Sequence, residues 1–136
     1  MQWDATTNAG FTSAEEPWLP VAPDYAEQNI ALQREDPRST LTLHRRLIQL
    51  RQAEDALKAG SYARIHAAGD ILAYSRRHNS DGFVVILNLG EKRQVVELDA
   101  ADSGRIALST HLDREGEEVS GRVSLRPDEG VVVRLG

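Results

Sequence analysis

Adjacent pairs of carboxylic acids are the residues of this sequence that could support acid–base chemistry. Four such pairs occur, at Glu15–Glu16, Glu54–Asp55, Glu117–Glu118 and Asp128–Glu129. A general acid and a general base must face one reacting bond, whereas side chains adjacent in a strand or helix point apart. All four pairs also lie in expected turns or on polar faces. We therefore predict that these carboxylates are solvated surface groups.

The histidines offer no recognisable metal or nucleophile site. No two of them have the spacing of metal ligands on a helix, and they are scattered at His44, His66, His78 and His111. No glycine-rich nucleotide motif and no GxSxG nucleophile motif occurs. We interpret Ser109-Thr110-His111 as a polar cluster beside a turn and not as part of a catalytic triad. The residues alone predict no metal, no cofactor and no composed active site.

Composition places the chain among ordinary globular domains. Its 136 residues include 16 Lys and Arg against 21 Asp and Glu, and no basic run is present, which argues against a nucleic-acid partner. No apolar run approaches the ~20 residues of a membrane span, and no leader pattern precedes the fold. The absence of cysteine excludes disulfides and thiolate metal sites. We expect a soluble cytoplasmic protein without membrane contact.

Hydrophobic periodicity divides the chain into an irregular segment and a helix before a region of strands. Residues 1–35 are expected to form a loop, because Pro17, Pro20 and Pro23 prevent a helix from passing through. A helix is expected over about residues 36–59, with Asp36 as N-cap, Pro37 at the first helical position and Gly60 as the stop. Its apolar stripe consists of Leu43, Leu47, Ile48 and Leu50.

Residues 61–136 carry the pattern of short strands separated by turns. Seven strands are expected, over residues 61–67, 71–78, 82–89, 93–99, 105–110, 121–126 and 130–135. The nearly continuous apolar run FVVILNL predicts the central strand. The fold class is therefore mainly β, an antiparallel β-sandwich preceded by an irregular loop and one amphipathic helix. The helix stripe must pack on the sandwich or on a partner that lies elsewhere.

A stand-alone carbohydrate-binding module is an alternative that this fold class allows. Such modules stack sugars on exposed aromatic rings, and the strand region offers Tyr62, Tyr74 and Phe83. Core positions are at least equally consistent with Tyr74 and Phe83, which weakens this alternative.

Several ordered motifs resemble the α-glucosidase branch of glycoside hydrolase family 13, which includes oligo-1,6-glucosidases. They are MQWD, NAGF, PWLPV, DP-x-S, LIQLR, GSY, ILAYSRR, GFVVILNLG and RPDEGVVVRL, and together they cover essentially the whole chain. The resemblance implies that residues 1–60 are the tail of a (β/α)8 barrel and that residues 61–136 are the C-terminal sandwich. The helix stripe would then face barrel strands.

The resemblance also implies where the family's chemistry lies. The nucleophile, the acid/base and the transition-state-stabilising carboxylate would all precede Met1, so no catalytic role is transferred to Asp4, Asp24 or Asp113. Gln2, Trp3 and Asp4 match a motif on the rim of the active site, although Trp3 could equally be a buried anchor of the loop. We expect the chain to be a structural fragment of a retaining α-glucosidase and to be inactive alone.

Three kinds of partner follow as expectations. The first is the missing catalytic barrel of the same enzyme. The second, under the binding-module alternative, is an α-gluco-oligosaccharide. The third is a second copy, because an orphaned helix stripe promotes self-association.

Overall fold

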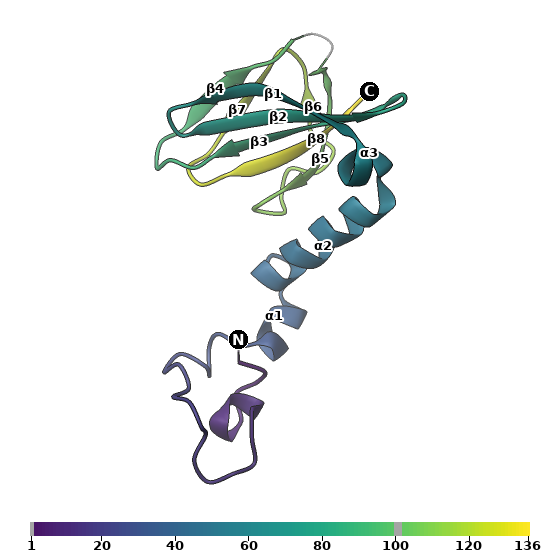
Figure 1. Cartoon of the computed structure of the whole chain (residues 1–136). Coiled ribbons are helices and arrows are strands. Elements are labelled where there is room, and N and C mark those ends of the chain that lie inside the picture. The colour runs from purple at the N-terminus through teal and green to yellow at the C-terminus, as the bar shows by residue number, and fades with distance from the viewer. Residues whose placement is uncertain (1, 100–101) are drawn as a thin grey trace. The chain divides into compact units, whose positions relative to one another are not determined.

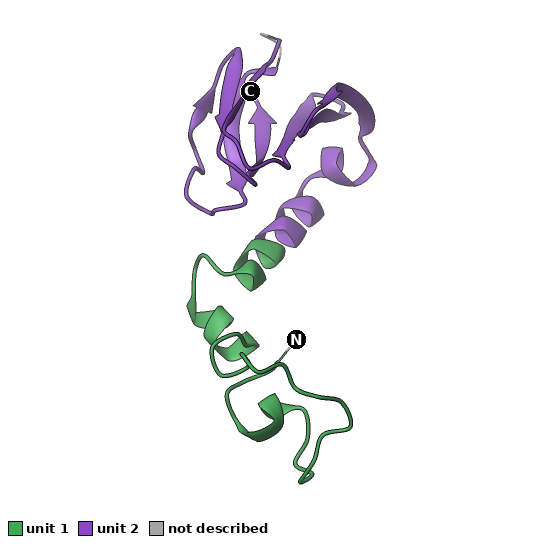
Figure 2. Ribbon diagram, turned by 90° about the vertical axis from the view of Figure 1, so that its left-hand side faces the viewer, with its two compact units in different colours: residues 1–45 green, residues 46–136 purple. Residues whose placement is uncertain are grey.

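The computed structural model describes residues 2–99 and 102–136, which form two compact units (Figures 1 and 2). Residues 1–45 make the first unit and residues 46–136 the second. The expected turn between residues 99 and 105 includes Ala100 and Ala101, which lie outside the described residues. The assignment of residues 1–60 to a barrel tail and of residues 61–136 to a separate domain stays a prediction.

The first unit is less irregular than its prolines suggest. It contains a 3-10 turn, η1 (Thr7–Gly10), and a short helix, α1 (Ile30–Glu35), in the segment predicted to be a loop throughout. The Asn29 side chain caps α1 by accepting a hydrogen bond from Leu32 N at 3.0 Å. Asn29 itself is fully buried and donates to the carbonyl of Tyr25. The prolines end at Pro23, so they do not prevent a helix that starts at Ile30.

The predicted start of the long helix was wrong by several residues. Helix α2 spans Thr40–Ala53, and the Ser39 hydroxyl accepts a hydrogen bond from Thr42 N at 3.1 Å at its beginning. The Asp36 carboxylate instead accepts from Arg38 N at 2.8 Å and thereby stabilises the turn before the helix. Asp36 and Ser39 are both residue types that favour the N-cap, and they lie three positions apart in the sequence; Ser39 is the one that caps α2.

The predicted single helix is in fact interrupted at Glu54. Glu54 adopts extended backbone angles (φ −112°, ψ 113°), and α3 (Asp55–Ala59) follows it. The Glu54 carboxylate forms a two-pronged ion pair with the guanidinium of Arg134. Gly60 ends α3 as expected; a Cβ there would lie 2.3 Å from the carbonyl oxygen of Ala56. Close backbone approach, and not a positive φ, is therefore the reason for glycine.

The second unit contains an antiparallel sandwich, which confirms the predicted mainly-β fold class. Within the described part of this unit, eight strands form it, namely β1 (Ser61–Ala68), β2 (Ile71–His78), β3 (Asp81–Asn88), β4 (Gln94–Glu97), β5 (Gly104–Ser109), β6 (Glu118–Val119), β7 (Arg122–Leu125) and β8 (Gly130–Leu135). The larger sheet has the order β1-β2-β3-β8-β5-β6, and β4 pairs with β7 in the smaller one (Figure 1). Strand β3, which carries the run FVVILN, is central as predicted.

All seven predicted strands are present, and the two-residue strand β6 was missed. It lies in a segment that reads as a turn cluster, and its pairing with β5 is too short to leave a periodic pattern. The inner faces of the two sheets enclose a core of alternating aliphatic residues. Its fully buried members include Val84, Ile86, Ile106, Leu125 and Val133.

Helix α3 packs on the outer face of the larger sheet, against β2 and β3. Phe83 is fully buried on that face, and the guanidinium of Arg134 lies 4.9 Å from the centre of its ring. Phe83 is therefore a core residue and cannot serve as a sugar platform. Tyr62 is 58% exposed, with its ring 5.3 Å from that of Tyr74.

The apolar stripe of α2 has no fully buried residue. Leu47 and Leu50 line a groove of about 290 Å³ beside the outer face of the larger sheet. Leu47 keeps 37% of its surface exposed and Ile48 keeps 55%. The stripe is thus only partly covered by its own sandwich.

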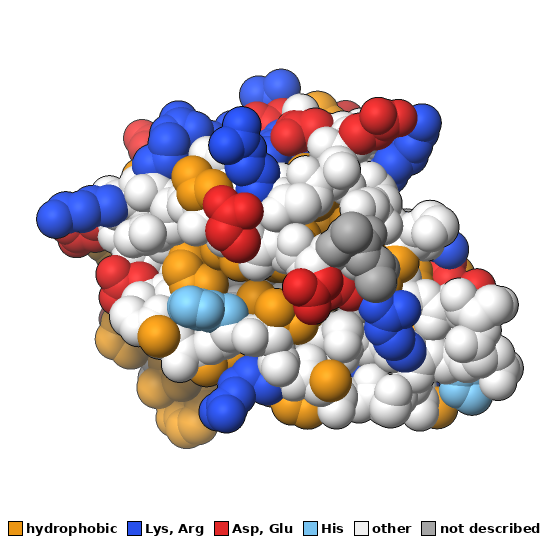
Figure 3. Space-filling model, turned by 90° about the horizontal axis from the view of Figure 1, so that it is seen from above, with side chains coloured by type: hydrophobic (Ala, Val, Ile, Leu, Met, Phe, Trp, Pro, Cys, Tyr) orange, Lys and Arg blue, Asp and Glu red, His pale blue; other side chains and the backbone are white. Residues whose placement is uncertain are grey.

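Charged side chains of both signs are interspersed on the face shown in Figure 3. Among the described residues, no helix is long and apolar enough to cross a membrane.

Truncation of Phe83 tests the contact between the sheet and its covering helix. We expect Phe83→Ala to lower the free energy of unfolding by about 3–5 kcal/mol, because it leaves a cavity beneath α3. Leu89→Ala is the matched control: Leu89 is 67% exposed, and we expect a change below about 0.5 kcal/mol. Urea denaturation measures both values, and equal effects would contradict the packing described here.

Candidate functional site

Backbone hydrogen bonds hold Gln2 and Trp3, two of the three predicted rim residues. The carbonyls of Gln2 and Trp3 accept hydrogen bonds from Ile30 N and Ala31 N at 2.9 and 3.0 Å. These amides belong to the first turn of α1, where they lack partners within the helix. Trp3 N in turn donates to the carbonyl of Ala9 at 3.0 Å. Gln2 and Trp3 therefore have a defined backbone position within the first unit.

The side chain of Trp3 is 53% exposed in this chain, and its place on a pocket rim or as a buried anchor stays a prediction. Asp4 accepts hydrogen bonds from the backbone and hydroxyl of Thr6. These two bonds lower the pKa of the Asp4 carboxyl, which favours its ionised form. An exposed indole and an ionised carboxylate are suited to contact a polyhydroxylated ligand.

The turn that follows holds three successive residues in the left-handed region. Asn8, Ala9 and Gly10 have φ values of 57°, 52° and 71°. A Cβ on Gly10 would lie 2.9 Å from Asp4 Oδ2, so glycine is required both by its φ and by the nearby carboxylate. Left-handed non-glycine residues store backbone strain, which concentrates at functional sites. A hollow of about 540 Å³ over residues 6–14 adjoins this turn.

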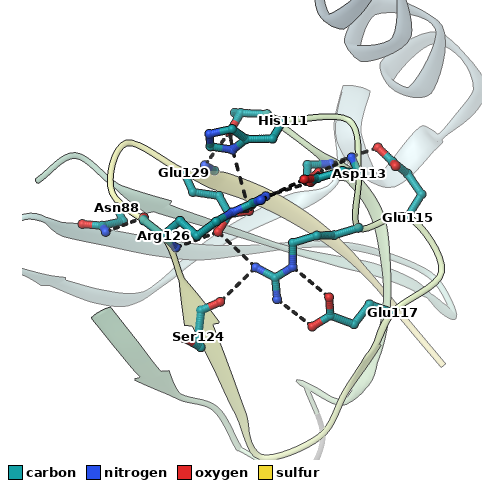
Figure 4. A network of polar contacts seen from close by, with 12 residues as sticks. Asn88, His111, Asp113, Glu115, Glu117, Ser124, Arg126 and Glu129 are labelled. Atoms are coloured by element: carbon teal, nitrogen blue, oxygen red, sulfur yellow. Dashed lines mark hydrogen bonds and ion pairs between the residues drawn. The ribbon is translucent and has the colours of Figure 1, made fainter. Parts of the chain in front are cut away.

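A second cluster of candidate residues surrounds the buried carboxylate of Glu129 in the sandwich (Figure 4). Glu129 is 1% exposed, so the prediction that the Asp128–Glu129 pair is solvated was wrong for Glu129. Its Oε2 accepts from Arg126 N at 2.7 Å and from Arg114 Nη1 at 3.1 Å, and its Oε1 accepts from Arg126 Nε at 3.0 Å. A carboxylate removed from water requires such partners.

Each of the two arginines bonds to a further carboxylate. Arg126 donates to both oxygens of Asp113 at 2.8 and 2.7 Å, and Arg114 donates to both oxygens of Glu117 at 2.8 and 2.6 Å. Arg114 also donates to the carbonyl of Ser124. We refer to Glu129, Arg114, Arg126, Asp113 and Glu117 as the Glu129 network.

Electrostatics identify the Glu129 network as structural. Burial alone would raise the pKa of Glu129, but the hydrogen bonds from Arg126 and the charge of Arg114 outweigh burial and lower it. The hydrogen bonds from Arg114 likewise lower the pKa of Glu117. A general acid needs a raised pKa, as in a glycosidase acid. The carboxyls of Glu129 and Glu117 have lowered pKa values and are held in the ionised form, so neither is suited to donate a proton.

The remaining sequence candidates do not converge on a reactive centre. Ser109 and Asp113 lie within hydrogen-bond distance, and the Nδ1 atom of His111 lies 3.8 Å from Glu129 Oε1, so the predicted polar cluster beside a turn is confirmed. Glu54 pairs with Arg134 instead of being solvated. Within residues 2–99 and 102–136, no group of three or more metal-binding side chains is present.

Sequence reasoning missed Glu129 because adjacency in a turn was taken as exposure. The available signal was its position: it immediately precedes the apolar strand β8, and Arg126 stands three residues before it. A turn placed against the end of a core strand directs one of its side chains inward.

Comparison with known proteins identifies the relatives of this chain. Residues 1–60 match the family model of the alpha-amylase catalytic domain. The oligo-1,6-glucosidase of Parageobacillus thermoglucosidasius is 36% identical over 139 residues, which cover 99% of this chain and 24% of that enzyme. The glucan 1,6-alpha-glucosidase of Streptococcus dysgalactiae subsp. equisimilis is 33% identical over 114 residues, 84% of this chain and 21% of that protein.

The alpha-amylase relatives are not all named as glycosidases. The amino acid transporter heavy chain SLC3A1 of Mus musculus is 36% identical over 141 residues, 98% of this chain and 21% of that protein. Among solved structures, the trehalulose synthase MutB from Pseudomonas mesoacidophila MX-45 matches with a TM-score of 0.90 at 29% identity, over 99% of this chain and 24% of that one. The chain is therefore related to alpha-amylase family proteins, and it spans between a fifth and a quarter of their length.

Removing the charge of Glu129 tests the Glu129 network. We expect Glu129→Gln to cost about 3 kcal/mol of unfolding free energy, the lower end for breaking a buried ion pair, because both arginines keep a second carboxylate. Glu118→Gln is the control, since Glu118 pairs with Arg105 at the surface, where such pairs contribute about 0–1 kcal/mol. Guanidinium denaturation measures both, and a loss below that of the control would contradict the account.

Acid sensitivity tests the same carboxylate independently. Because the folded-state pKa of Glu129 lies below its unfolded value, its stabilising effect is complete above about pH 4.3 and is lost as the pH falls through the folded-state pKa. We expect the unfolding free energy of the unmodified chain to fall more steeply in acid than that of Glu129→Gln. Parallel pH profiles would show that Glu129 does not contribute.

Proposed function

We propose that this chain is the C-terminal structural portion of an alpha-amylase family glycosidase that acts on α-glucosidic bonds of oligosaccharides. One observation carries the proposal: the match to the catalytic-domain model covers residues 1–60, and the sandwich begins at Ser61. Glycosidase relatives align across both parts, as the 99% coverage by the oligo-1,6-glucosidase indicates.

In this proposal residues 1–60 complete the catalytic barrel, and the sandwich stabilises it. The stripe of α2, which has no fully buried residue, would be covered by that barrel. Gln2, Trp3 and Asp4 would form part of the pocket rim. The exposure of Trp3 and the fixed, ionised carboxylate of Asp4 support that role.

The proposal assigns the bond-breaking carboxylates to the barrel. A retaining glycosidase needs two carboxyl groups about 5–5.5 Å apart, one of them with a raised pKa. Glu129, a buried carboxylate of the sandwich, is bonded to two arginines and has a lowered pKa. It is therefore suited to hold the sandwich together and not to act as the acid.

A chimeric enzyme tests the proposal. The segment of the Parageobacillus oligo-1,6-glucosidase that aligns with this chain is replaced by the chain. We expect the chimera to fold and to hydrolyse isomaltose. The same chimera carrying Glu129→Gln is the control: we expect it to melt at a lower temperature with unchanged turnover per folded molecule. A folded chimera without hydrolysis would contradict the proposal.

The isolated chain gives a complementary test. We expect the pure 136-residue chain to release no p-nitrophenol from p-nitrophenyl α-glucoside above the rate in buffer, because the lowered pKa values of Glu117 and Glu129 leave these carboxyls unsuited to act as the general acid. Hydrolysis that is lost on Asp4→Asn would instead place catalysis within this chain.

The similarity to a transporter heavy chain favours a second candidate, in which the sandwich is a binding or interaction module. The exposed ring of Tyr62 beside Tyr74 offers one stacking surface for a sugar. This candidate predicts saturable binding of maltose or isomaltose to the chain alone, abolished by Tyr62→Ala. Titration calorimetry that detects no heat for either sugar would exclude the carbohydrate-binding form.

A further inference from the structure

The first unit presents an acidic and apolar segment to solvent, residues 15–19. Trp18 is 93% exposed and Leu19 is 60% exposed, and both follow the exposed Glu15 and Glu16. Neither glutamate forms an ion pair among the described residues. A tryptophan with almost its entire surface in water is unusual, and such side chains mark interaction surfaces.

The second unit presents a groove of the opposite character. Its walls are α2 and α3 on one side and the outer face of the larger sheet on the other, and its volume is about 290 Å³. The apolar lining consists of Leu47, Leu50, Leu57, Tyr74, Val85 and Val132. A hollow of this size accommodates one large side chain and its neighbour, since liquid water occupies ~30 Å³ per molecule.

Two unpaired cations border this groove. Arg51 and Arg76 both line it, and neither forms an ion pair within residues 2–99 and 102–136. The Nε atom of Arg76 is buried and has no hydrogen-bond partner, and its Nη2 reaches only the carbonyl of Lys58, at 3.4 Å. A buried donor without an acceptor is costly, so the groove lacks an anion or acceptor at this point.

We propose that residues 15–19 of one copy dock into this groove on a second copy. Trp18 and Leu19 fill the apolar lining, and the two glutamates supply the carboxylates that Arg51 and Arg76 lack. The segment and the groove thus match in both apolar character and charge. Pro17 and Pro20 restrict the backbone on either side of Trp18, which reduces the entropy lost on docking.

The contact joins two different surfaces, so it is heterologous. A heterologous contact that does not close into a ring extends with concentration. We therefore expect the average mass of the 136-residue chain in light scattering to rise above 15.0 kDa with increasing concentration. Salt should reduce this mass, because charge pairs at the edge of the interface are screened. The inference concerns the 136-residue chain by itself, because in the proposed glycosidase the barrel would cover the α2 stripe that lines this groove.

Two single variants and their mixture provide the test. Trp18→Ala removes the docking segment and Leu47→Asp disables the groove; both side chains are exposed enough for the fold to persist, which circular dichroism verifies. Each variant alone should remain at 15.0 kDa at all concentrations. Mixed together, they should form a complex of two chains, because each supplies the surface that the other lacks. Leu89→Asp, at an exposed position outside both surfaces, should associate like the unmodified chain.

Three results would contradict the proposed docking of residues 15–19 into the groove. A chain that stays at the monomer mass at every concentration would overturn the proposal. So would association that persists in Trp18→Ala, or a mixture of the two variants that remains monomeric, since either result would assign self-association to another surface.

Discussion

The carboxylate of Glu129 is removed from water at the point where three segments of the sandwich meet. It bonds to Arg126 at the end of β7, to Arg114 in the loop between β5 and β6, and it immediately precedes β8. A buried charge of this kind is tolerated only when every partner is in place. Because Glu129 needs these partners, it holds the end of β7 and the β5–β6 loop next to the start of β8. Strand β8 in turn pairs with both β3 and β5 in the larger sheet. The turn before β8 is also held by Asn88, which donates to the carbonyl of Arg126.

The strand pattern was predictable because alternation of apolar residues directly reflects two packed sheets. Val84 and Ile86 of β3 face the core, and the central place of this strand follows from its continuous apolar run. The features that the sequence did not predict, such as the break in the helix, depend on contacts between residues distant in sequence. Glu54 interrupts the helix where its carboxylate meets Arg134, eighty residues away, and no local signal records that partner. Ser39 and Asp36 are similar capping residues, and only the surrounding turn decides between them. Of the candidate site, the rim residues came from the family resemblance, whereas the inward direction of Glu129 required the fold.

The acidic residues of this chain illustrate how environment decides function. Asp4 and Glu129 are both kept ionised by hydrogen bonds, one at an exposed turn and the other in the core. An ionised carboxylate on an open surface can contact a ligand, and one locked between arginines stabilises a fold. Neither has the environment of a proton donor. This division is consistent with our proposal that the sandwich has a stabilising role and that bond cleavage takes place in a barrel of the whole protein.

The amide of Arg126 offers the most direct measurement of the central claim. It lies outside the strand ladders, and its acceptor is the side-chain oxygen Oε2 of Glu129 at 2.7 Å. Hydrogen exchange followed by NMR should therefore show this amide to be protected to the same degree as that of Val84 in the core of β3, and Glu129→Gln should remove the protection selectively. Rapid exchange of the Arg126 amide in the unmodified chain, as in an exposed turn, would contradict the account that Glu129 ties the sandwich together.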